Sequence, residues 1–194
     1  MSLQLPSKWK NLLMILSKLS IRYYGHPDLR TKAKPVGEIT PEVIRICEEM
    51  LETMLSFENC IGFAGPQLGI PLRIFVIREE ISLENNQYAF GEPEVIINPV
   101  LTEPSEEMVT MSEGCMSLPG LHVDVARPKS ISVRYQNREG EWIEEKLDDF
   151  RARMFMHEND HLNGVLMVDR IDPALRKEIE PLLRAMKKKF VIRR

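Results

Sequence analysis

The order of hydrophobic patterns along the chain predicts an α+β fold with mostly antiparallel sheets. A helical pattern comes first, short strand-like runs follow between residues 71 and 143, and helical patterns return after Asp148. Strands that alternated with single helices would instead indicate a doubly wound α/β fold. We therefore expect antiparallel sheets packed around a central helix that carries a His-Glu-x-x-His motif, with another helix at the C-terminus.

The length and composition of the chain fit a single domain. Its 194 residues, of which 43% are hydrophobic, can bury an ordinary core. We expect residues 1–20 to form an N-terminal extension, with a short amphipathic helix over residues 7–19. Residues 21–194 are then expected to form the one domain.

The first helix of this domain is predicted after Thr40. Pro41 stands at the helical position that tolerates proline best, and apolar residues then recur at steps of three and four. This spacing gives the helix one apolar face toward the core. Cys47 lies on that face, so we interpret it as a small buried side chain and not as a metal ligand.

Five short apolar or alternating runs predict strands, because proline, glycine and asparagine separate them. They cover residues 72–77, 95–97, 123–126, 131–135 and 142–143. Residues 137–140 predict a hairpin turn between the last two runs, so we expect antiparallel pairing there.

Two helical patterns follow the strands. The first begins after Asp148 and Asp149, either of which can cap a helix, and reaches Gly164, a natural stop. The second is expected over about residues 173–188, where apolar residues keep helical spacing.

Charge and cysteine content exclude some classes of protein. A net charge of -3 and a pI near 5.9 give no overall basic field, so DNA or another nucleic acid is not the expected ligand of the whole surface. The three cysteines are an odd count without a convincing export signal, and no apolar run is long enough for a membrane span. We expect a cytoplasmic protein, with an organelle as the alternative because the start of the chain lacks acidic residues.

The strongest local signal is the segment His157-Glu158-Asn159-Asp160-His161, which lies where a helix is expected. Residues four apart share a helix face, so both imidazoles point the same way, and Glu158 stands within reach of a water on a bound metal. Two histidines on an apolar stripe need polar partners when buried, and a metal supplies both. Asp160 is either a solvated residue or an acceptor that orients a ligand imidazole.

Two histidines leave a catalytic zinc-type site one protein ligand short. The metzincin pattern would place a third histidine where this chain has Met167. A thermolysin-like site would use a glutamate on a following helix, for which Glu178 and Glu180 are candidates. Cys115, in a glycine-containing loop between predicted strands, is a further candidate, and spacing alone leaves these alternatives open.

Three separate segments resemble the peptide deformylase family. They are Gly62-Phe63-Ala64-Gly65-Pro66-Gln67-Leu68-Gly69, Glu113-Gly114-Cys115-Met116-Ser117 and His157-Glu158-Asn159-Asp160-His161-Leu162. They occur in the family's order and at its usual separations, so together they are far more specific than any one alone. The resemblance covers roughly residues 22–175.

The resemblance implies a role for each residue of the site. Cys115, His157 and His161 would bind one divalent metal, usually Fe²⁺ and replaceable by Zn²⁺ or Ni²⁺, and Glu158 would be the catalytic acid/base. Gln67 and the backbone N–H of Met116 would contact the formyl oxygen. Ile61, Gly62 and Gly114 would offer backbone groups to an extended peptide.

The implied reaction removes the formyl group from the N-terminal N-formylmethionine of newly made polypeptides and releases formate. An apolar pocket for the methionine side chain is expected, with Ile61, Phe150 and Met154 as candidates to line it. The implied compartment is the bacterial cytoplasm. The basic C-terminal segment is either a solvated helix end, where positive charge suits the helix dipole, or a contact with ribosomal RNA.

Some positions depart from the family pattern. Cys60 replaces a frequent glycine, Gly65 replaces an alanine, and Met156 replaces a frequent glutamine.

Two rival functions stay open. The enzyme alternative is a zinc endopeptidase of the His-Glu-x-x-His type. The alternative without activity is a structural metal module or a binder of formylated N-termini, and a closed site that used Cys60 as fourth ligand would favour it.

Overall fold

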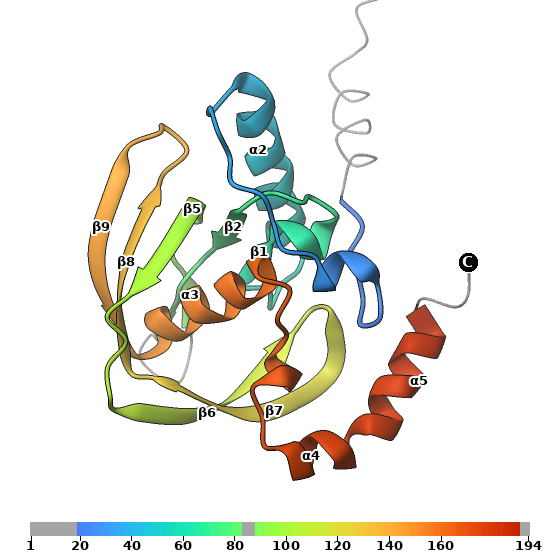
Figure 1. Ribbon diagram of the computed structural model, residues 1–194. Helices are drawn as coiled ribbons and strands as arrows, with labels where there is room; N and C mark the ends of the chain where they lie inside the picture. The colour runs from blue at the N-terminus through green and yellow to red at the C-terminus, as the bar shows by residue number, and fades with distance from the viewer. Residues whose placement is uncertain (1–18, 83–87, 191–194) are drawn as a thin grey trace, which may run out of the picture.

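The computed structural model describes residues 19–82 and 88–190, and it confirms the α+β prediction. A five-stranded antiparallel sheet has the order β1 (Gly62–Ala64), β2 (Ile74–Ile77), β5 (Glu94–Thr102), β8 (Ser130–Gln136) and β9 (Trp142–Asp148). Two further strand pairs are antiparallel hairpins: β3 (Glu80–Ser82) with β4 (Tyr88–Phe90), and β6 (Met108–Cys115) with β7 (Leu118–Pro128). Figure 1 shows helix α3 (Asp149–Leu162) between the large sheet and the β6–β7 hairpin.

The large sheet is covered on both faces, as strand β2 shows. All four of its residues are buried. Phe75 and Ile77 pack with residues of α3, whereas Ile74 and Val76 pack with residues of α2 (Pro41–Leu55) on the opposite face. A strand buried on both faces appears in the sequence as a continuous apolar run, which is the pattern that predicted it.

Helix α2 begins as the sequence predicts. The hydroxyl of Thr40 accepts a hydrogen bond from the Val43 N–H, and Pro41 occupies the first turn. Cys47 is 1% exposed and packs in the cluster between α2 and the sheet, so its interpretation as a core residue is confirmed.

Helix α3 is entered and left through sharp backbone turns. Asp149 has a φ of 44°, so the chain turns abruptly out of β9, although Asp148 makes no side-chain capping bond. Gly164 follows the helix with a φ of 73°, and a Cβ on it would lie 2.8 Å from the carbonyl oxygen of Arg30. Only glycine fits this close approach, which fixes the end of the helix.

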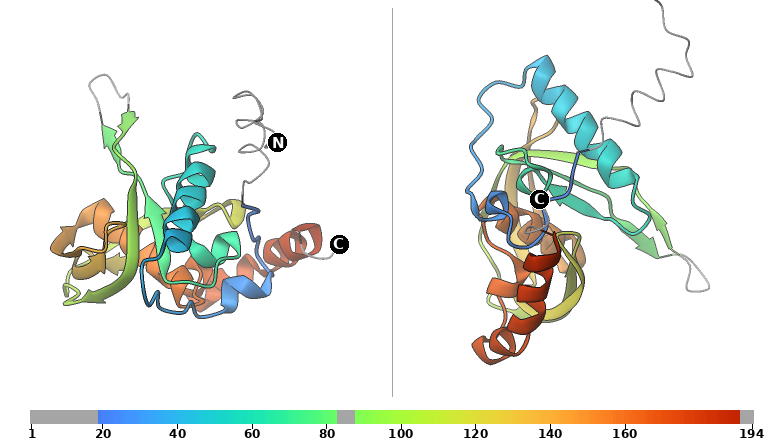
Figure 2. Two further views of the ribbon diagram at one scale, coloured as in Figure 1. Left: turned by 90° about the horizontal axis from the view of Figure 1, so that it is seen from above. Right: turned by 90° about the vertical axis from the view of Figure 1, so that its right-hand side faces the viewer.

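The predicted C-terminal helix is interrupted. Helix α4 (Pro173–Glu178) and helix α5 (Glu180–Phe190) are separated at Ile179. Short 3₁₀ turns are η1 (Pro27–Arg30), η2 (Gly65–Leu68) and η4 (Met167–Asp169), and α5 packs with η4, β7 and Leu29 of η1 in a third cluster. Figure 2 shows α5 at the end of the molecule opposite β8 and β9.

Four of the five predicted strand regions lie within strands, the run 72–77 begins two residues before β2, and the β8–β9 hairpin is antiparallel as expected. Strands β1, β3, β4 and β6 were not predicted. The helix expected over residues 7–19 falls almost entirely outside the described residues. In the part of the chain that is described, no helix combines the length and the apolar character needed to cross a bilayer.

Candidate metal centre

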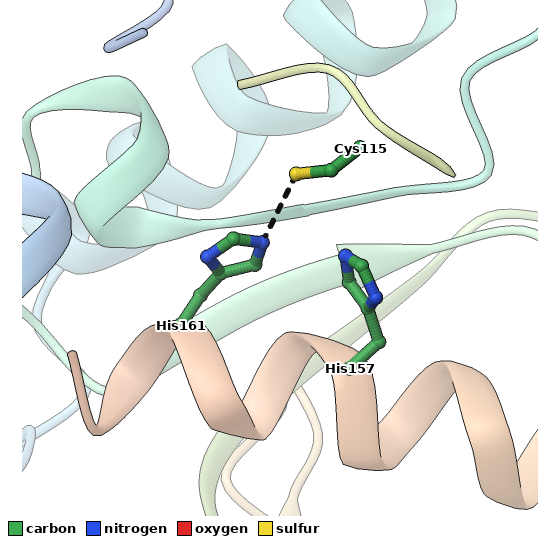
Figure 3. Close-up of side chains that lie close together, drawn as sticks. All are labelled: Cys115, His157 and His161. Carbon is green, nitrogen blue, oxygen red and sulfur yellow. Dashed lines mark hydrogen bonds between the residues drawn. The ribbon is translucent and has the colours of Figure 1, made fainter. Parts of the chain in front are cut away.

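His157 and His161 lie one turn apart on helix α3 and face the same side, as their spacing predicts. Their ring centroids are 5.0 Å apart. His161 is 1% exposed and its Nε2 points at the third residue of the group, as Figure 3 shows. The two imidazoles therefore meet in a largely dry part of the molecule.

The third residue of the group is Cys115, at the tip of the β6–β7 hairpin. Its Sγ lies 3.3 Å from Nε2 of His161. The pairing register of the hairpin shifts between Gly114 and Cys115, and such a bulge re-aims a side chain at a strand end. One donor atom from each of the three residues lies within 4.8 Å of the other two. A thiolate and two imidazoles at this mutual distance fit a single transition-metal ion.

A buried network of ion pairs contacts this group through His157, and Glu113 is at the centre of the network. Glu113 Oε2 lies 2.9 Å from Nδ1 of His157, and both carboxylate oxygens accept hydrogen bonds from Arg127, at 2.6 and 3.0 Å. Arg153 donates to the same carboxylate at 2.6 Å. Burial alone would raise the pKa of Glu113, but the hydrogen bonds from His157 and Arg127 outweigh it and hold this pKa well below its usual value.

The sequence interpretation assigned no role to Glu113. Spacing gave no signal for it, because β6 was not predicted as a strand and its pairing register shifts between Gly114 and Cys115. With its Nδ1 engaged by Glu113, His157 has only Nε2 left to act as a ligand.

Glu158 lies beside the two histidines and is 6% exposed. Burial raises its pKa to about 7, and its Oε2 has no hydrogen-bond partner among the described residues. The backbone of Gly62 passes so close that a Cβ there would lie 2.5 Å from Glu158 Oε1. Glu158 is thus a carboxyl group that is poised to gain or lose a proton near neutral pH.

Gln67 reaches the same centre from η2. Its side-chain oxygen accepts a hydrogen bond of 2.8 Å from the Ala64 N–H, which fixes the orientation of the amide. Its Nε2 then donates to Ser117 Oγ at 3.2 Å and to Cys115 Sγ at 3.4 Å. The amide N–H₂ group therefore faces Cys115, one of the three residues of the metal group.

A cleft of about 590 Å³ opens over this centre. Its walls include every residue to which the family resemblance gave a role except the buried His161, together with the three candidates for the methionine pocket. These residues are Ile61, Gly62, Gln67, Gly114, Cys115, Met116, Phe150, Met154, His157 and Glu158. The volume lies in the range of ligand-binding clefts.

Three other candidates are placed elsewhere. Glu178 is the last residue of α4, and Glu180 pairs with Arg176 and Arg184 along the C-terminal helices; neither glutamate is part of the metal group. Asp160 is neither solvated nor bonded to a histidine: it is 5% exposed and binds Arg127 and Arg170. It therefore belongs to the ionic network behind the centre.

Cys60 lines the cleft but is not in the metal group. Its Sγ donates to the carbonyl oxygen of Gly62 at 3.3 Å, and burial raises the pKa of this thiol to about 12. A thiol that keeps its proton is a poor metal ligand. The geometry gives no support to a closed four-ligand site.

A cysteine and two histidines around one point, a buried carboxyl group beside them and an open cleft define a class of protein, the metal-dependent hydrolases. A family model described as Polypeptide deformylase matches residues 18–177. The chain belongs to this family. A peptide deformylase of Thermotoga petrophila is 42% identical over 172 residues, which cover 87% of this chain and 98% of that protein.

Solved structures agree with this membership. The crystal structure of the Thermotoga maritima peptide deformylase has a TM-score of 0.70 and 42% identity, and the match covers 80% of this chain and 99% of that one. A Synechococcus elongatus peptide deformylase in complex with actinonin has a TM-score of 0.73 and 37% identity, with 88% and 86% of the two chains covered. An Arabidopsis thaliana peptide deformylase 1B has a TM-score of 0.78 and 30% identity, with 88% and 90% covered.

Proposed function

We propose that this protein hydrolyses the formamide of an N-terminal N-formylmethionine in newly made polypeptides and releases formate and a free amine. The observation that carries the proposal is the buried carboxyl group of Glu158 beside the Cys115, His157 and His161 group, on a cleft open to a peptide. Membership of the polypeptide deformylase family supports it independently.

Cys115, His157 and His161 are the proposed ligands of one divalent metal ion. When bound, the metal would polarise the formyl carbonyl group and acidify a water molecule. We propose Fe²⁺ as the metal, with Zn²⁺ and Ni²⁺ as possible replacements. A thiolate together with two imidazoles suits all three ions, so metal content has to be measured anaerobically.

Glu158 is the proposed acid/base. Its carboxylate accepts a proton from the attacking water as the oxygen of that water adds to the formyl carbon. The same proton then passes to the nitrogen of the leaving amine as the C–N bond breaks. A carboxyl group with a pKa of about 7 can perform both transfers near neutral pH.

Gln67 and Met116 are the proposed donors to the formyl oxygen, which gains negative charge during the attack. The Gln67 amide is held in place by its bond from Ala64. Loss of one such donor costs on the order of 10² to 10³ in kcat. The backbones of Ile61, Gly62 and Gly114 are the proposed partners of the peptide main chain.

Ile61, Phe150 and Met154 are the proposed lining of the methionine pocket. All three stand on the walls of the cleft. Phe150 and Met154 precede His157 along α3, so this pocket occupies the end of the cleft nearest the start of that helix.

The central test is the activity of Glu158→Ala toward formyl-Met-Ala-Ser, with metal content measured on the same sample. We expect a loss of about 10² to 10⁴ in kcat with the metal retained. Glu52→Ala, an exposed glutamate of α2, is the matched control and should keep full activity. A Glu158→Ala variant that turns over at nearly the wild-type rate would refute the proposal.

Product analysis separates this function from that of a zinc endopeptidase. A deformylase releases formate and leaves Met-Ala-Ser intact, whereas an endopeptidase cleaves a bond inside a longer peptide. Cleavage of unformylated peptides without release of formate would favour the endopeptidase.

We propose the ribosome as a partner of helix α5. Its exposed side chains include four basic residues, Arg184, Lys187, Lys188 and Lys189. Removal of α5 would also delete the buried side chains of Leu183 and Met186 and expose the residues of the third cluster that they cover, so charge substitution is the cleaner test. Cosedimentation of the wild type and of an Arg184→Gln, Lys188→Gln, Lys189→Gln variant with ribosomes, across salt concentrations, should show weaker binding by the variant. Equal binding would remove this partner.

The bacterial cytoplasm is the proposed compartment, because nascent chains that begin with formylmethionine are made there. The bacterial relatives support this assignment. An organelle that makes such chains is the alternative, and it is consistent with the plant relative.

A further inference from the structure

The connection between helix α2 and strand β1, residues 56–61, forms part of the wall of the cleft. Phe57, Asn59, Cys60 and Ile61 all line the cleft. The connection contains no helix or strand, so no ladder of backbone hydrogen bonds holds it in shape. Within it, the Cys60 N–H donates to the Phe57 carbonyl oxygen at 3.4 Å. A segment with so few backbone hydrogen bonds opens easily, and its shape has to come from other contacts.

The side chain of Arg78, directly after strand β2, binds three carbonyl oxygens of this connection. Its Nε donates to Cys60 at 2.8 Å, and its Nη2 donates to Phe57 at 2.9 Å and to Glu58 at 2.8 Å. The guanidinium group is planar and rigid, so the three bonds fix these carbonyl groups relative to one another. The main-chain N–H of Arg78 also donates to the Ile61 carbonyl oxygen at 2.9 Å.

Arg78 is a buried cation, with 8% of its surface exposed. Its guanidinium carbon lies 3.8 Å from the centre of the Phe90 ring, which belongs to β4. Figure 2 shows the β3–β4 hairpin projecting from the body of the molecule. The carbonyl oxygens and the face of the ring replace the water that the guanidinium group loses on burial. The group therefore has one defined position, and so do the carbonyl groups bound to it.

The bond from Arg78 to Cys60 also acts on Ile61. The Cys60 carbonyl group and the Ile61 N–H belong to one planar peptide unit. A charged donor on the carbonyl oxygen fixes the plane of this unit and polarises it, which makes the N–H a stronger hydrogen-bond donor. The backbone of Ile61 is a proposed partner of the peptide main chain. Arg78 is not among the residues that line the cleft, so it would act on the peptide only through this segment.

We propose that Arg78 is a positioning residue for peptide binding, which fixes and polarises the Ile61 N–H that donates to a main-chain carbonyl oxygen of the peptide. This inference rests on the proposed deformylase function. Gly62, which lies against Glu158, is held separately, because it pairs with Ile77 in the β1–β2 ladder. Loss of the Arg78 side chain should therefore weaken peptide binding and leave the chemical step nearly unchanged.

The test is the turnover of formyl-Met-Ala-Ser by Arg78→Met, with metal content measured on the same sample. Methionine keeps an apolar side chain at this position but makes none of the three side-chain bonds. We expect KM to rise about ten-fold while kcat stays within about two-fold of the wild type. Arg78→Lys keeps the charge but has a single nitrogen in place of the planar group, so its KM should rise by only about three-fold.

Arg134→Met is the matched control, because Arg134 also lies over an aromatic ring. Its guanidinium carbon is 4.0 Å from the centre of the Trp142 ring, and it pairs with Glu144 of β9. This variant should keep the wild-type KM.

A purely structural role for Arg78 would give a different result. A loss of stability lowers the fraction of active protein, and so lowers the apparent kcat of Arg78→Met at an unchanged KM. That result, or kinetics identical to the wild type, would overturn the inference while the proposed function stands. If Arg78→Met does not fold, the KM of Arg78→Lys decides in the same way. Failure of the metal-loaded wild type to hydrolyse formyl-Met-Ala-Ser would overturn both.

Discussion

The Glu113 carboxylate lies 2.9 Å from Nδ1 of His157 and joins a proposed metal ligand to a buried pair of arginines. Both side chains of the Glu113–Arg127 pair are at most 5% exposed. Such a carboxylate fixes the tautomer and the orientation of the imidazole, so that Nε2 faces the metal before it binds.

Glu113→Gln is therefore expected to weaken metal binding by about 10- to 100-fold. An amide is a poorer hydrogen-bond partner for the imidazole, and it leaves Arg127 and Arg153 without the negative charge of the carboxylate. Competition with a chromophoric chelator measures the dissociation constant. Glu107→Gln is the control, since Glu107 immediately precedes β6 and its side chain is 63% exposed. Unchanged metal affinity in a folded Glu113→Gln variant would rule out this role.

Asp160 offers a second prediction, because it binds one buried and one exposed arginine. Asp160→Asn leaves the buried Arg127 without one of its two carboxylates, so we expect the free energy of unfolding to fall by about 3 kcal/mol. Arg170→Gln removes a side chain that is 48% exposed and should cost less than about 1 kcal/mol. Urea denaturation of the metal-saturated proteins measures both values. Equal losses in the free energy of unfolding for the two variants would contradict the expectation that the contact with the buried arginine contributes more than the contact with the exposed one.

The histidine motif was predictable from the sequence because a helix imposes one fixed spacing. His157, Glu158 and His161 needed only the helical period to be brought together. Cys115 lies more than forty residues away, and its approach depends on a hairpin that no local pattern specifies. Only the resemblance to the family selected it over Glu178 and Glu180.

The ionic network and strand β6 could not be predicted, for a related reason. Strand β6 has only one buried residue, Glu113, so it lacks the apolar alternation that indicates a strand. Arg127 and Asp160 contact each other across 33 residues of sequence, and charged residues usually indicate a solvated surface. The expected division of the chain at residue 20 stays a prediction, because residues 1–18 lie outside the described part.

Arg151 provides a prediction about the start of helix α3. Its guanidinium contacts Glu79 at 2.8 Å, Glu94 at 2.7 Å and Glu145 at 3.3 Å, and so ties the helix to the sheet. Arg151→Met leaves three carboxylates facing one another, and we expect a loss of about 2 kcal/mol in the free energy of unfolding. Arg138→Met removes an exposed pair and should leave the free energy of unfolding nearly unchanged. Thermal and urea unfolding should rank the two variants in this order, and the reverse order would contradict the prediction.

Gly62 gives the sharpest test of how closely the acid/base is held. A Cβ at this position would lie 2.5 Å from Oε1 and 3.0 Å from Cδ of Glu158, so the carboxyl group has to move in Gly62→Ala. A displacement of about 1 Å can cost on the order of 10² in rate, and we expect that loss in kcat while the metal stays bound. Gly37→Ala is the matched control, because a Cβ on Gly37 meets no heavy atom within 4 Å. Turnover of formyl-Met-Ala-Ser and metal content are measured on both variants. Full activity in Gly62→Ala would mean that Glu158 does not need the position it has beside this glycine, and the proposed proton transfers would then lose their geometric basis.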